Sequence, residues 1–361
     1  MRVKLSDVTK YLKGTQINGD DLIENGEYIY LNGGINPSGR WNAANVKENT
    51  VTISEGGNSS GYVNYVTEPF WCGAHCYYLF DGPKNTRYLY YALKSQQERL
   101  FGIRSGACMP NIKKADLGKF EFEFDTDEQK QSKVVAVLSK IEVVIGERKR
   151  ELELLDELIK ARFVEMFESI HESKKYPYIV VKDLTDVISG GTPSRKKAEY
   201  WDNGTIPWVK TTELQNNVII DVDEYITEAG LTDSSAKLVP AGTVLIAMYG
   251  QGKTRGMTAY LGIDASTNQA CACILPSNKM DSVFLWKYFE LSYDKLRRLA
   301  QGAGQPNLNG NMIKNFPVLV PPIDMQKDYV NFVNQIDKSK FISINIIPEG
   351  GFYNGDKFYI S

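Results

Sequence analysis

Apolar and polar positions alternate in short runs over two separate stretches of the chain, residues 1–125 and 176–322. Runs such as 50–53 and 119–124 are rich in β-branched and aromatic residues and are bounded by clusters of Gly and Asn. This pattern is typical of strands joined by turns. Residues 86–101 instead place leucines at helical spacing. The pattern predicts two β-rich domains, the first of which carries a helical segment.

A long heptad pattern separates the two stretches. From 134 to 166, apolar positions recur at alternating spacings of four and three once Arg148 and Arg162 are counted in the same stripe. Such periodicity indicates a coiled-coil helix, and Asp127 can cap its first turn. The helix would be roughly 60–65 Å long, which favours a spacer over a helix packed on its own domain. The predicted fold class is α+β, with two similar β-rich domains joined by a long helix over 126–175.

A second helix is expected after the second β-rich stretch, and it is expected to be short. Its apolar pattern covers 323–340, whereas residues 341–346 alternate like a strand. Pro348 and the glycines at 350–351 then break any helix. We therefore predict an irregular tail over 341–361. The abrupt loss of the heptad pattern suggests a rearranged or frame-shifted gene, and a helix continuing past residue 350 would contradict that hypothesis.

The two β-rich stretches are copies of one another. Pro-Asn-Ile at 110–112 recurs as Pro-Asn-Leu at 306–308, and Phe120 recurs as Phe316, so that 306 − 110 = 316 − 120 = 196. A repeat of that length is a whole domain rather than a solenoid unit. Nearer the domain starts the offset is only 177–179. The second copy is therefore expected to contain insertions, mostly before Thr243.

Composition limits the classes of protein to which the chain can belong. Its hydrophobic content of 42% and charged content of 24% are ordinary for a globular protein. No apolar run approaches the roughly 18 residues of a membrane span, and the N-terminus lacks an apolar signal core, so a cytoplasmic protein is expected. The net charge of −2 and the pI of about 5.9 argue against a simple, strongly basic nucleic-acid binder. Any DNA binding must use basic residues gathered locally or supplied by a partner.

The cysteines do not indicate a metal site. Their odd number, five, favours reduced thiols in the cytosol. Cys72 and Cys76 flank His75 at a metal-like spacing, but a closed zinc site requires four ligands. Residues 70–80 are moreover expected to form one buried strand. We predict no bound metal.

One segment approaches a phosphate-binding loop. Residues 247–254 read Ala-Met-Tyr-Gly-Gln-Gly-Lys-Thr, but the P-loop pattern requires Gly in place of Ala247. The residues that follow are typical of a strand, whereas a P-loop opens a helix. His75 and His171 have no nucleophile partner that the sequence can place. A nucleotide-dependent enzyme that uses the Lys253 loop stays open as an alternative, as does a two-domain scaffold that binds protein and not DNA.

Several short motifs occur in a fixed order in the second copy. They are Gly-Gly-Thr-Pro-Ser at 190–194, Tyr-Trp at 200–201, Ile-Pro-Trp-Val at 206–209, Gly-Thr-Val-Leu-Ile at 242–246, Ser-Thr-Asn-Gln-Ala-Cys at 266–271 and Gln-Pro-Asn at 305–307. In this order, and with the duplication, they resemble the specificity (S) subunit of type I restriction–modification systems over roughly residues 1–340.

The resemblance implies a fold and a function. Residues 1–125 and 176–322 would be target recognition domains, each reading one half of a split target in double-stranded DNA, and the two helices would pair antiparallel as a spacer. Two modification (methyltransferase) subunits, which methylate adenine, would dock on the chain, and restriction subunits would join them. The chain itself would be non-catalytic and bind no cofactor. S-adenosylmethionine is expected in the partner methyltransferase.

The resemblance also directs attention to polar and basic residues on loops beside glycines. Contacts to phosphates position such a protein, and contacts to base edges give specificity. The candidates in the first copy are Arg40, Asn58, Ser59 and Tyr62. Those in the second copy are Arg195, Lys196 and Lys197 for phosphates, Tyr249, Gln251, Lys253 and Arg255 for base edges or groove entry, and Lys210 as a further residue.

Overall fold

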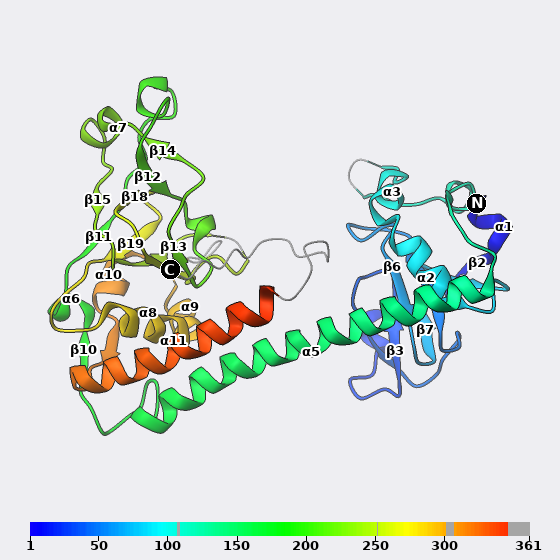
Figure 1. The fold of residues 1–361 in the computed structure, drawn as a ribbon, viewed down its shortest axis with the longest axis horizontal. Helices are drawn as coiled ribbons and strands as arrows, with labels where there is room; N and C mark the ends of the chain where they lie inside the picture. The colour runs from blue at the N-terminus through cyan, green and yellow to red at the C-terminus, as the bar shows by residue number, and fades with distance from the viewer. Residues whose placement is uncertain (107–108, 251, 301–306, 346–361) are drawn as a thin grey trace. The chain divides into compact units, whose positions relative to one another are not determined.

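The computed structural model describes residues 1–106, 109–250, 252–300 and 307–345, with the backbone alone for 341–345. The chain divides into two compact units, Met1–Val144 and Ile145–Ser361 (Figure 1). Within these described ranges no helix is both long and apolar enough to cross a membrane.

The first unit is built on two sheets. The larger is antiparallel with the order β2-β8-β5-β6, and the smaller has the order β4-β3-β7, in which β3 and β7 run parallel. A further pair, β1 with β9, joins the start of the unit to its end. The strands are β1 (Arg2–Lys4), β2 (Lys10–Lys13), β3 (Tyr28–Leu31), β4 (Gly39–Trp41), β5 (Thr50–Ser54), β6 (Val63–Val66), β7 (Phe70–Cys72), β8 (Cys76–Phe80) and β9 (Glu121–Glu123). The short helices are α1 (Leu5–Val8), η1 (Gly19–Asp21), α2 (Thr86–Lys94), α3 (Gln97–Gly102) and α4 (Lys114–Gly118).

Helix α2 packs on the larger sheet because its leucines share one side. Asn85 caps the helix by accepting the amide of Tyr88 at 3.1 Å, as an Asn before the first turn commonly does. Leu89 and Leu93 are buried in one core with Val51 of β5. Burying each such side chain contributes about 1.5–3 kcal/mol. This packing fixes β5 and, with it, the turn that follows β5.

The second unit repeats this plan with additions. Its sheets have the orders β11-β19-β16-β17-β13 and β14-β12-β18-β15, and β10 pairs with β20. The strands are β10 (Tyr178–Val180), β11 (Val187–Ser189), β12 (Ile206–Val209), β13 (Asn217–Ile219), β14 (Tyr225–Ile226), β15 (Leu238–Val239), β16 (Val244–Ala247), β17 (Thr258–Leu261), β18 (Ala265–Thr267), β19 (Cys271–Ile274) and β20 (Pro317–Leu319). The short helices are α6 (Val181–Leu184), η2 (Ala198–Tyr200), η3 (Thr211–Glu213), α7 (Glu228–Thr232), α8 (Ser282–Leu291), α9 (Tyr293–Leu299) and α10 (Gly310–Lys314).

The strand orders confirm the duplication. The sequence β2-β8-β5-β6 of the first unit is matched by β11-β19-β16-β17, and β4-β3-β7 is matched by β14-β12-β18. The central pairs of the smaller sheets, β3 with β7 and β12 with β18, are both parallel. The elements without a counterpart among the described residues of the first unit, η3, β13, α7 and β15, all precede Thr243. The insertions therefore lie where the changing offset predicted them.

Helix α5 (Glu128–Phe167) is a single helix of 40 residues, close to the predicted length. Asp127 caps it as expected, because its Oδ1 accepts the amides of Gln129 at 2.9 Å and Lys130 at 3.3 Å. The helix ends where Glu168 adopts a φ of 68°, the left-handed conformation that commonly terminates helices. The division between the two units falls inside α5.

Helix α11 (Ile323–Asn345) is longer than the sequence predicted. It has 23 residues and continues five residues beyond Lys340, through positions expected to alternate like a strand. Extending an existing helix costs far less than nucleating one, so the weak helix propensity of these residues does not stop it. Residues 346–361 lie outside the described residues. Whether a helix continues past residue 350, which would contradict the hypothesis of a rearranged gene, is therefore not tested.

Helix α11 runs antiparallel to the last turns of α5 (Figure 1). Tyr329 and Val333 are buried in one core with Ile159 and Phe163 of α5, and the rings of Tyr329 and Phe163 meet edge to face at 5.4 Å. Within the second unit, α11 and the last turns of α5 therefore pair antiparallel, as the resemblance implies for the two helices.

Residues 70–80 do not form the single strand that we expected. Strand β7 ends at Cys72 and pairs with β3, whereas β8 begins at Cys76 and lies in the other sheet between β2 and β5. A turn separates them, in which Gly73 donates its amide to Leu31 O and accepts the amide of Cys76. This change of sheet could not be predicted from the sequence, because both strands are rich in apolar residues and Gly73 is the one turn-forming residue between them.

Candidate nucleic-acid interface

Each unit carries a Gly-rich turn between two antiparallel strands of its larger sheet. The first turn (residues 55–62) joins β5 to β6, and the second turn (residues 248–257) joins β16 to β17. Gly61 and Gly256 close them with almost the same backbone angle, φ of 85° and 86°, which glycine adopts far more readily than other residues. Each donates its amide at 2.8 Å to the last residue of the preceding strand, Ser54 or Ala247.

The repeated Pro-Asn-Ile and Pro-Asn-Leu motifs hold these turns. In the first unit, Ile112 donates its amide to Glu55 O at 2.8 Å, and in the second Leu308 donates to Met248 O at 3.0 Å. Glu55 and Met248 are the first residues of the two turns. In the first unit Gly57 also donates to Pro110 O at 2.9 Å. The motif that first indicated the duplication is thus a backbone support for the turn in both units.

A short helix supports each turn from the side. The buried Gln97 of α3 donates to Gly61 O at 2.7 Å and accepts the amide of Val63 at 3.0 Å. Tyr293 of α9, which is 196 residues later, donates to Lys253 O at 2.7 Å. Sequence reasoning missed both residues, because the repeat conserves their position and not their chemistry.

Two arginines complete the support. Arg104 donates from Nε to Ser60 O at 2.6 Å, and Arg297 donates from Nη1 to Arg255 O at 2.8 Å. These arginines do not occupy equivalent positions in the repeat, since 297 − 104 = 193 falls three short of the local offset of 196. No pattern in the sequence therefore distinguishes these two arginines from others.

The candidate residues of the first copy fall on the first turn, apart from one. Asn58 is exposed at the tip, Ser59 donates to Gly33 O at 2.6 Å, and the ring of Tyr62 lies 3.6 Å from Lys94 Nζ. Arg40 instead lies on β4, where its guanidinium donates to the carbonyls of residues 26 and 27 at 2.5 and 2.7 Å. The Arg40 side chain therefore has a structural role in the smaller sheet.

In the second copy the base-edge candidates gather on the second turn. Tyr249 is 42% exposed, Lys253 is also exposed, and Arg255 is half-buried. Gln251 lies outside the described residues. The turn leads from strand to strand without opening a helix, and the Lys253 carbonyl is bound by Tyr293. This geometry lacks the helix N-terminus with which a P-loop cradles phosphate.

Most of the phosphate candidates are engaged in ion pairs beside the smaller sheet. Glu224 pairs with Arg195 and, at 3.1 Å, with Lys210. The hydrogen bond from Arg195 is the main reason why the pKa of Glu224 lies below its ordinary value. Arg195 also stacks 3.6 Å from the Trp201 ring. A phosphate would have to displace Glu224 from both cations.

Two further candidates differ in their surroundings. Lys197 is bound by Tyr200 OH at 2.6 Å and lies 3.6 Å from Glu199. Lys196 is exposed.

The charges around the first turn are mixed. Glu55 accepts from Lys13 at 2.7 Å and lies 3.2 Å from His75 Nδ1. Partial burial raises the pKa of Glu55, but the bonds to Lys13 and His75 outweigh it and keep that pKa below its ordinary value. Burial lowers the pKa of Lys94, behind Tyr62, to about 8. Positive, negative and neutral polar groups therefore all lie beside the first turn.

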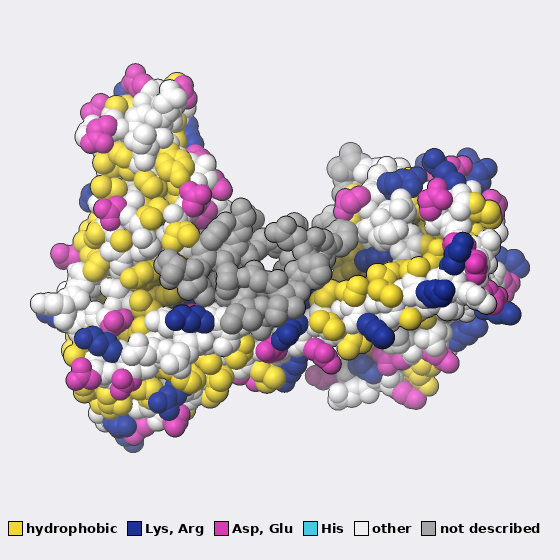
Figure 2. Space-filling model, viewed as in Figure 1, with side chains coloured by type: hydrophobic (Ala, Val, Ile, Leu, Met, Phe, Trp, Pro, Cys, Tyr) yellow, Lys and Arg dark blue, Asp and Glu magenta, His cyan; other side chains and the backbone are white. Residues whose placement is uncertain are grey.

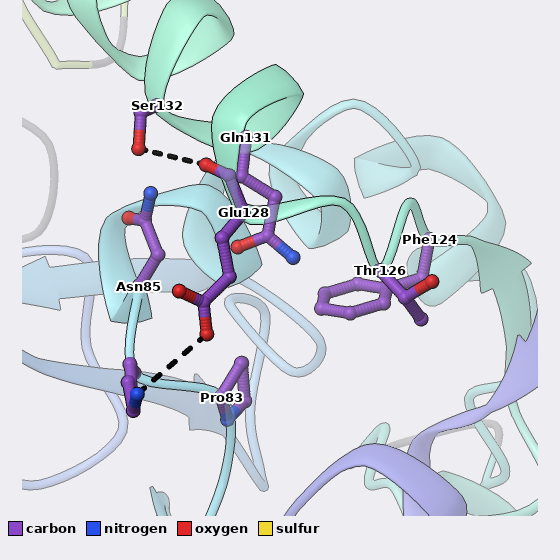
Figure 3. A pocket seen from close by; sticks show the side chains of 8 residues that line it. Pro83, Asn85, Phe124, Thr126, Glu128, Gln131 and Ser132 are labelled. Carbon is purple, nitrogen blue, oxygen red and sulfur yellow. Dashed lines mark hydrogen bonds and ion pairs between the residues drawn. The ribbon is translucent and has the colours of Figure 1, made fainter.

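A hollow of about 510 Å³ beside the start of α5 does not form a comparable site (Figure 3). Lys84 and Glu128 face each other across it at 3.8 Å, and Gln131 donates to Asp125 O at 2.6 Å. Lys84 and Glu128 form a surface ion pair, and Gln131 is held by the backbone. The hollow marks the junction of α2 and α5.

A family model of the type I restriction modification DNA specificity domain matches residues 1–154 and 174–349. The chain belongs to this family. The two matched segments contain the two copies, which confirms the predicted α+β plan of two similar domains joined by a long helix.

Known members of the family are similar to the chain over part of their length. The specificity subunit of a type I restriction enzyme of Escherichia coli is 24% identical over 213 residues, which is 57% of this chain and 52% of the relative. A putative type I specificity subunit of Mycoplasma genitalium is 34% identical over 149 residues, 40% of this chain and 38% of the relative. These alignments thus span about half or less of the relatives.

Solved structures show the same fold. The S subunit of a type I restriction–modification system from M. genitalium superposes with a TM-score of 0.63 at 20% identity, over 96% of this chain and 91% of that one. A chain from a study of complex assembly in a type I system superposes with a TM-score of 0.54 at 14% identity, over 97% and 94%.

Proposed function

We propose that the chain is the DNA-binding specificity subunit of a type I restriction–modification complex and reads a split target, one half with each unit. The observation that carries this proposal is the duplicated turn. In both units the turn follows the same strand, closes on a glycine of the same φ and is held by the same backbone bond from the Pro-Asn-Ile or Pro-Asn-Leu motif. Two copies of one reading element fit a target with two halves.

The two readers gain from being in one chain. Each can be weak alone, because linking them raises the effective concentration of the second once the first has bound. Helix α5 connects the units without a break. Half-sites about 34 Å apart, one turn of the duplex, would let both readers approach the same side.

Side chains on the two turns are the proposed contacts to DNA. Asn58 in the first turn can pair with an adenine edge, and Lys253 and Arg255 in the second can pair with guanine. Lys196, which is exposed, is the phosphate candidate that we retain. Arg195 and Lys210 are less suitable, because Glu224 already pairs with both.

An apolar seam on α5 supports the proposed docking of partner subunits. Val134, Val137, Ile141 and Val144 recur at coiled-coil spacing and are 41%, 57%, 42% and 50% exposed. Figure 2 shows apolar side chains along this part of α5. An apolar stripe with this spacing is suited to a partner helix.

The duplication supports the same conclusion. At the offset of 196, Val134 and Val137 correspond to Val330 and Val333 of α11, which are buried against α5. We propose that two modification subunits, which use S-adenosylmethionine to methylate adenine, cover the exposed seam, and that restriction subunits join them. The chain itself would be a non-catalytic cytoplasmic component.

Selection from randomised duplexes tests the proposed function. The chain is incubated with and without its methyltransferase partner, and bound DNA is recovered and sequenced. We expect a split consensus, two short specified blocks separated by unspecified positions, that is enriched with the partner. A single continuous consensus, or no enrichment, would contradict the proposal.

A further inference from the structure

We propose that Arg104 and Arg297 are positioning residues that set the shape of the two turns and thereby determine which bases each turn prefers. The inference rests on the proposed function, since it assigns a role within the same DNA-reading site. It begins from the closing glycines, Gly61 and Gly256. The residue before each, Ser60 or Arg255, presents its carbonyl to one of the two arginines.

The two arginines are prepared for this contact in the same way. The Arg104 guanidinium lies 4.0 Å from the Phe101 ring, and that of Arg297 lies 5.2 Å from the Tyr293 ring. Both rings belong to the short helix that supports the turn, α3 or α9. Stacking on an aromatic face orients the planar guanidinium before it binds. Arg297 also donates to Tyr293 OH at 3.0 Å. Because Tyr293 in turn donates to Lys253 O, the two side chains that hold the second turn are bonded to each other.

The copies reach this contact from different positions in the repeat. At the offset of 196, Arg297 corresponds to Phe101 and not to Arg104. The arginine and the aromatic residue therefore occupy different positions in the two copies. The contact to the carbonyl before the closing glycine is nevertheless present in both units. The contact itself, and not an inherited residue, is the common feature.

A fixed carbonyl restricts the conformation of the turn. When the arginine holds the oxygen of Ser60 or Arg255, the peptide plane that joins this residue to the closing glycine is held in one orientation. Both arginines are half-buried, which suits a support behind the turn better than a contact on its outer surface.

Substitution of each arginine in the complex tests the role. We would compare Arg104→Met and Arg297→Met, using duplexes in which only one half of the selected target is randomised. The matched controls are Arg99→Met on α3 and Arg298→Met on α9. Arg99 is exposed and bonds Gln96, and Arg298 is exposed on the helix next to Arg297.

We expect each methionine variant to lose discrimination in one half only. A correctly read base pair gives about tenfold discrimination or more, and this should fall to about twofold or less in the half read by the altered turn. Lysine in place of either arginine should restore part of it, because one donor remains. The slope of affinity against salt should stay unchanged, whereas a phosphate contact would lower it by about 0.9.

A DNA-free measurement separates this inference from the proposed function. Hydrogen exchange of the free chain should be faster over the first turn in Arg104→Met and over the second turn in Arg297→Met, and unchanged elsewhere. Unchanged exchange, or unchanged base preference in both halves, would overturn the positioning role while the wild-type consensus stands. If exchange changes as expected but the wild-type complex enriches no split target, the DNA-reading function fails and the support of the turn stands.

Discussion

Lys340 of α11 pairs with Asp156 of α5, with 2.5 Å between Nζ and Oδ1. Asp337, one turn earlier on α11, lies 3.5 Å from Lys340 and 3.7 Å from Lys287 of α8. The Lys287 side chain is only 7% exposed and also pairs with Glu290. This network connects three helices beside their aromatic core, so it fixes how α11 lies on α5.

Loss of Asp337 should weaken the second unit. Asp337→Asn removes one of the two carboxylates that lie within ion-pair distance of the buried Lys287, the other being Glu290, and removing one partner from a buried charge is costly. We expect the free energy of unfolding to fall by about 1–3 kcal/mol. Asp156→Asn, which removes a largely exposed carboxylate, should cost at most about 1 kcal/mol. Urea unfolding measures both, and equal losses would show that burial of Lys287 is not the cause.

The glycines of the first turn should differ in how well they accept a side chain. Gly57 and Gly61 both have positive φ, 76° and 85°, so alanine strains the backbone at each by about 1–2 kcal/mol. At Gly57 the space around a Cβ is open, whereas at Gly61 a Cβ would lie 2.9 Å from Leu100 O. Gly61→Ala should therefore lower the free energy of unfolding clearly more than Gly57→Ala. Denaturation curves of the two variants decide, and equal losses would contradict the placement of Gly61.

Lys94 should make the stability of the first unit depend on pH. Its folded-state pKa is lowered from 10.5 to about 8 by burial, so between these values the unfolded chain binds more protons than the folded one. Stability from this group therefore rises as pH increases from about 8 to 10.5 and is lost as pH falls back through 8. Lys94→Met should flatten the curve of unfolding free energy against pH in that window. Identical curves for variant and wild type would refute the shift.

The apolar seam on α5 should bind a partner helix. Val137→Glu places a charge in the seam and should weaken capture of the methyltransferase partner by at least about tenfold, since a buried unpaired charge costs several kcal/mol. Val143→Glu is the matched control, because Val143 is equally exposed, at 59%, but lies off the seam. Neither variant should change the melting temperature noticeably. Equal binding by both variants would place the partner elsewhere.

Features that depend on neighbouring residues could be predicted from the sequence. The length of α5 and its cap at Asp127 follow from heptad spacing and local hydrogen bonding, and the duplication follows from the repeated Pro-Asn motif. The end of α11 could not be predicted, because residues after Lys340 continue a helix that packing in its earlier turns has already formed. The division of residues 70–80 between two sheets depends on pairing with distant strands.

The candidate site was predictable to a similar degree. Glycines and polar residues together pointed to the two turns, and the structure places six of the candidate residues on them: Asn58, Ser59, Tyr62, Tyr249, Lys253 and Arg255. That these residues contact DNA stays a prediction. The engagement of Arg195 by Glu224 was hidden, because the two residues are 29 positions apart and meet only in the folded sheet. Arg104 and Arg297 were hidden for a different reason, since they make equivalent contacts from positions that the repeat does not align.

We propose above all that each duplicated turn reads its own half of one target. Selection of randomised duplexes by the complex carrying either Asn58→Ala or Lys253→Ala tests it most directly, because both side chains are exposed at the tips of the turns. We predict that each substitution broadens the base preference in one block of the split consensus, that the two affected blocks differ, and that the other block is unchanged. A change in the same block for both substitutions, or in both blocks for either, would contradict the account.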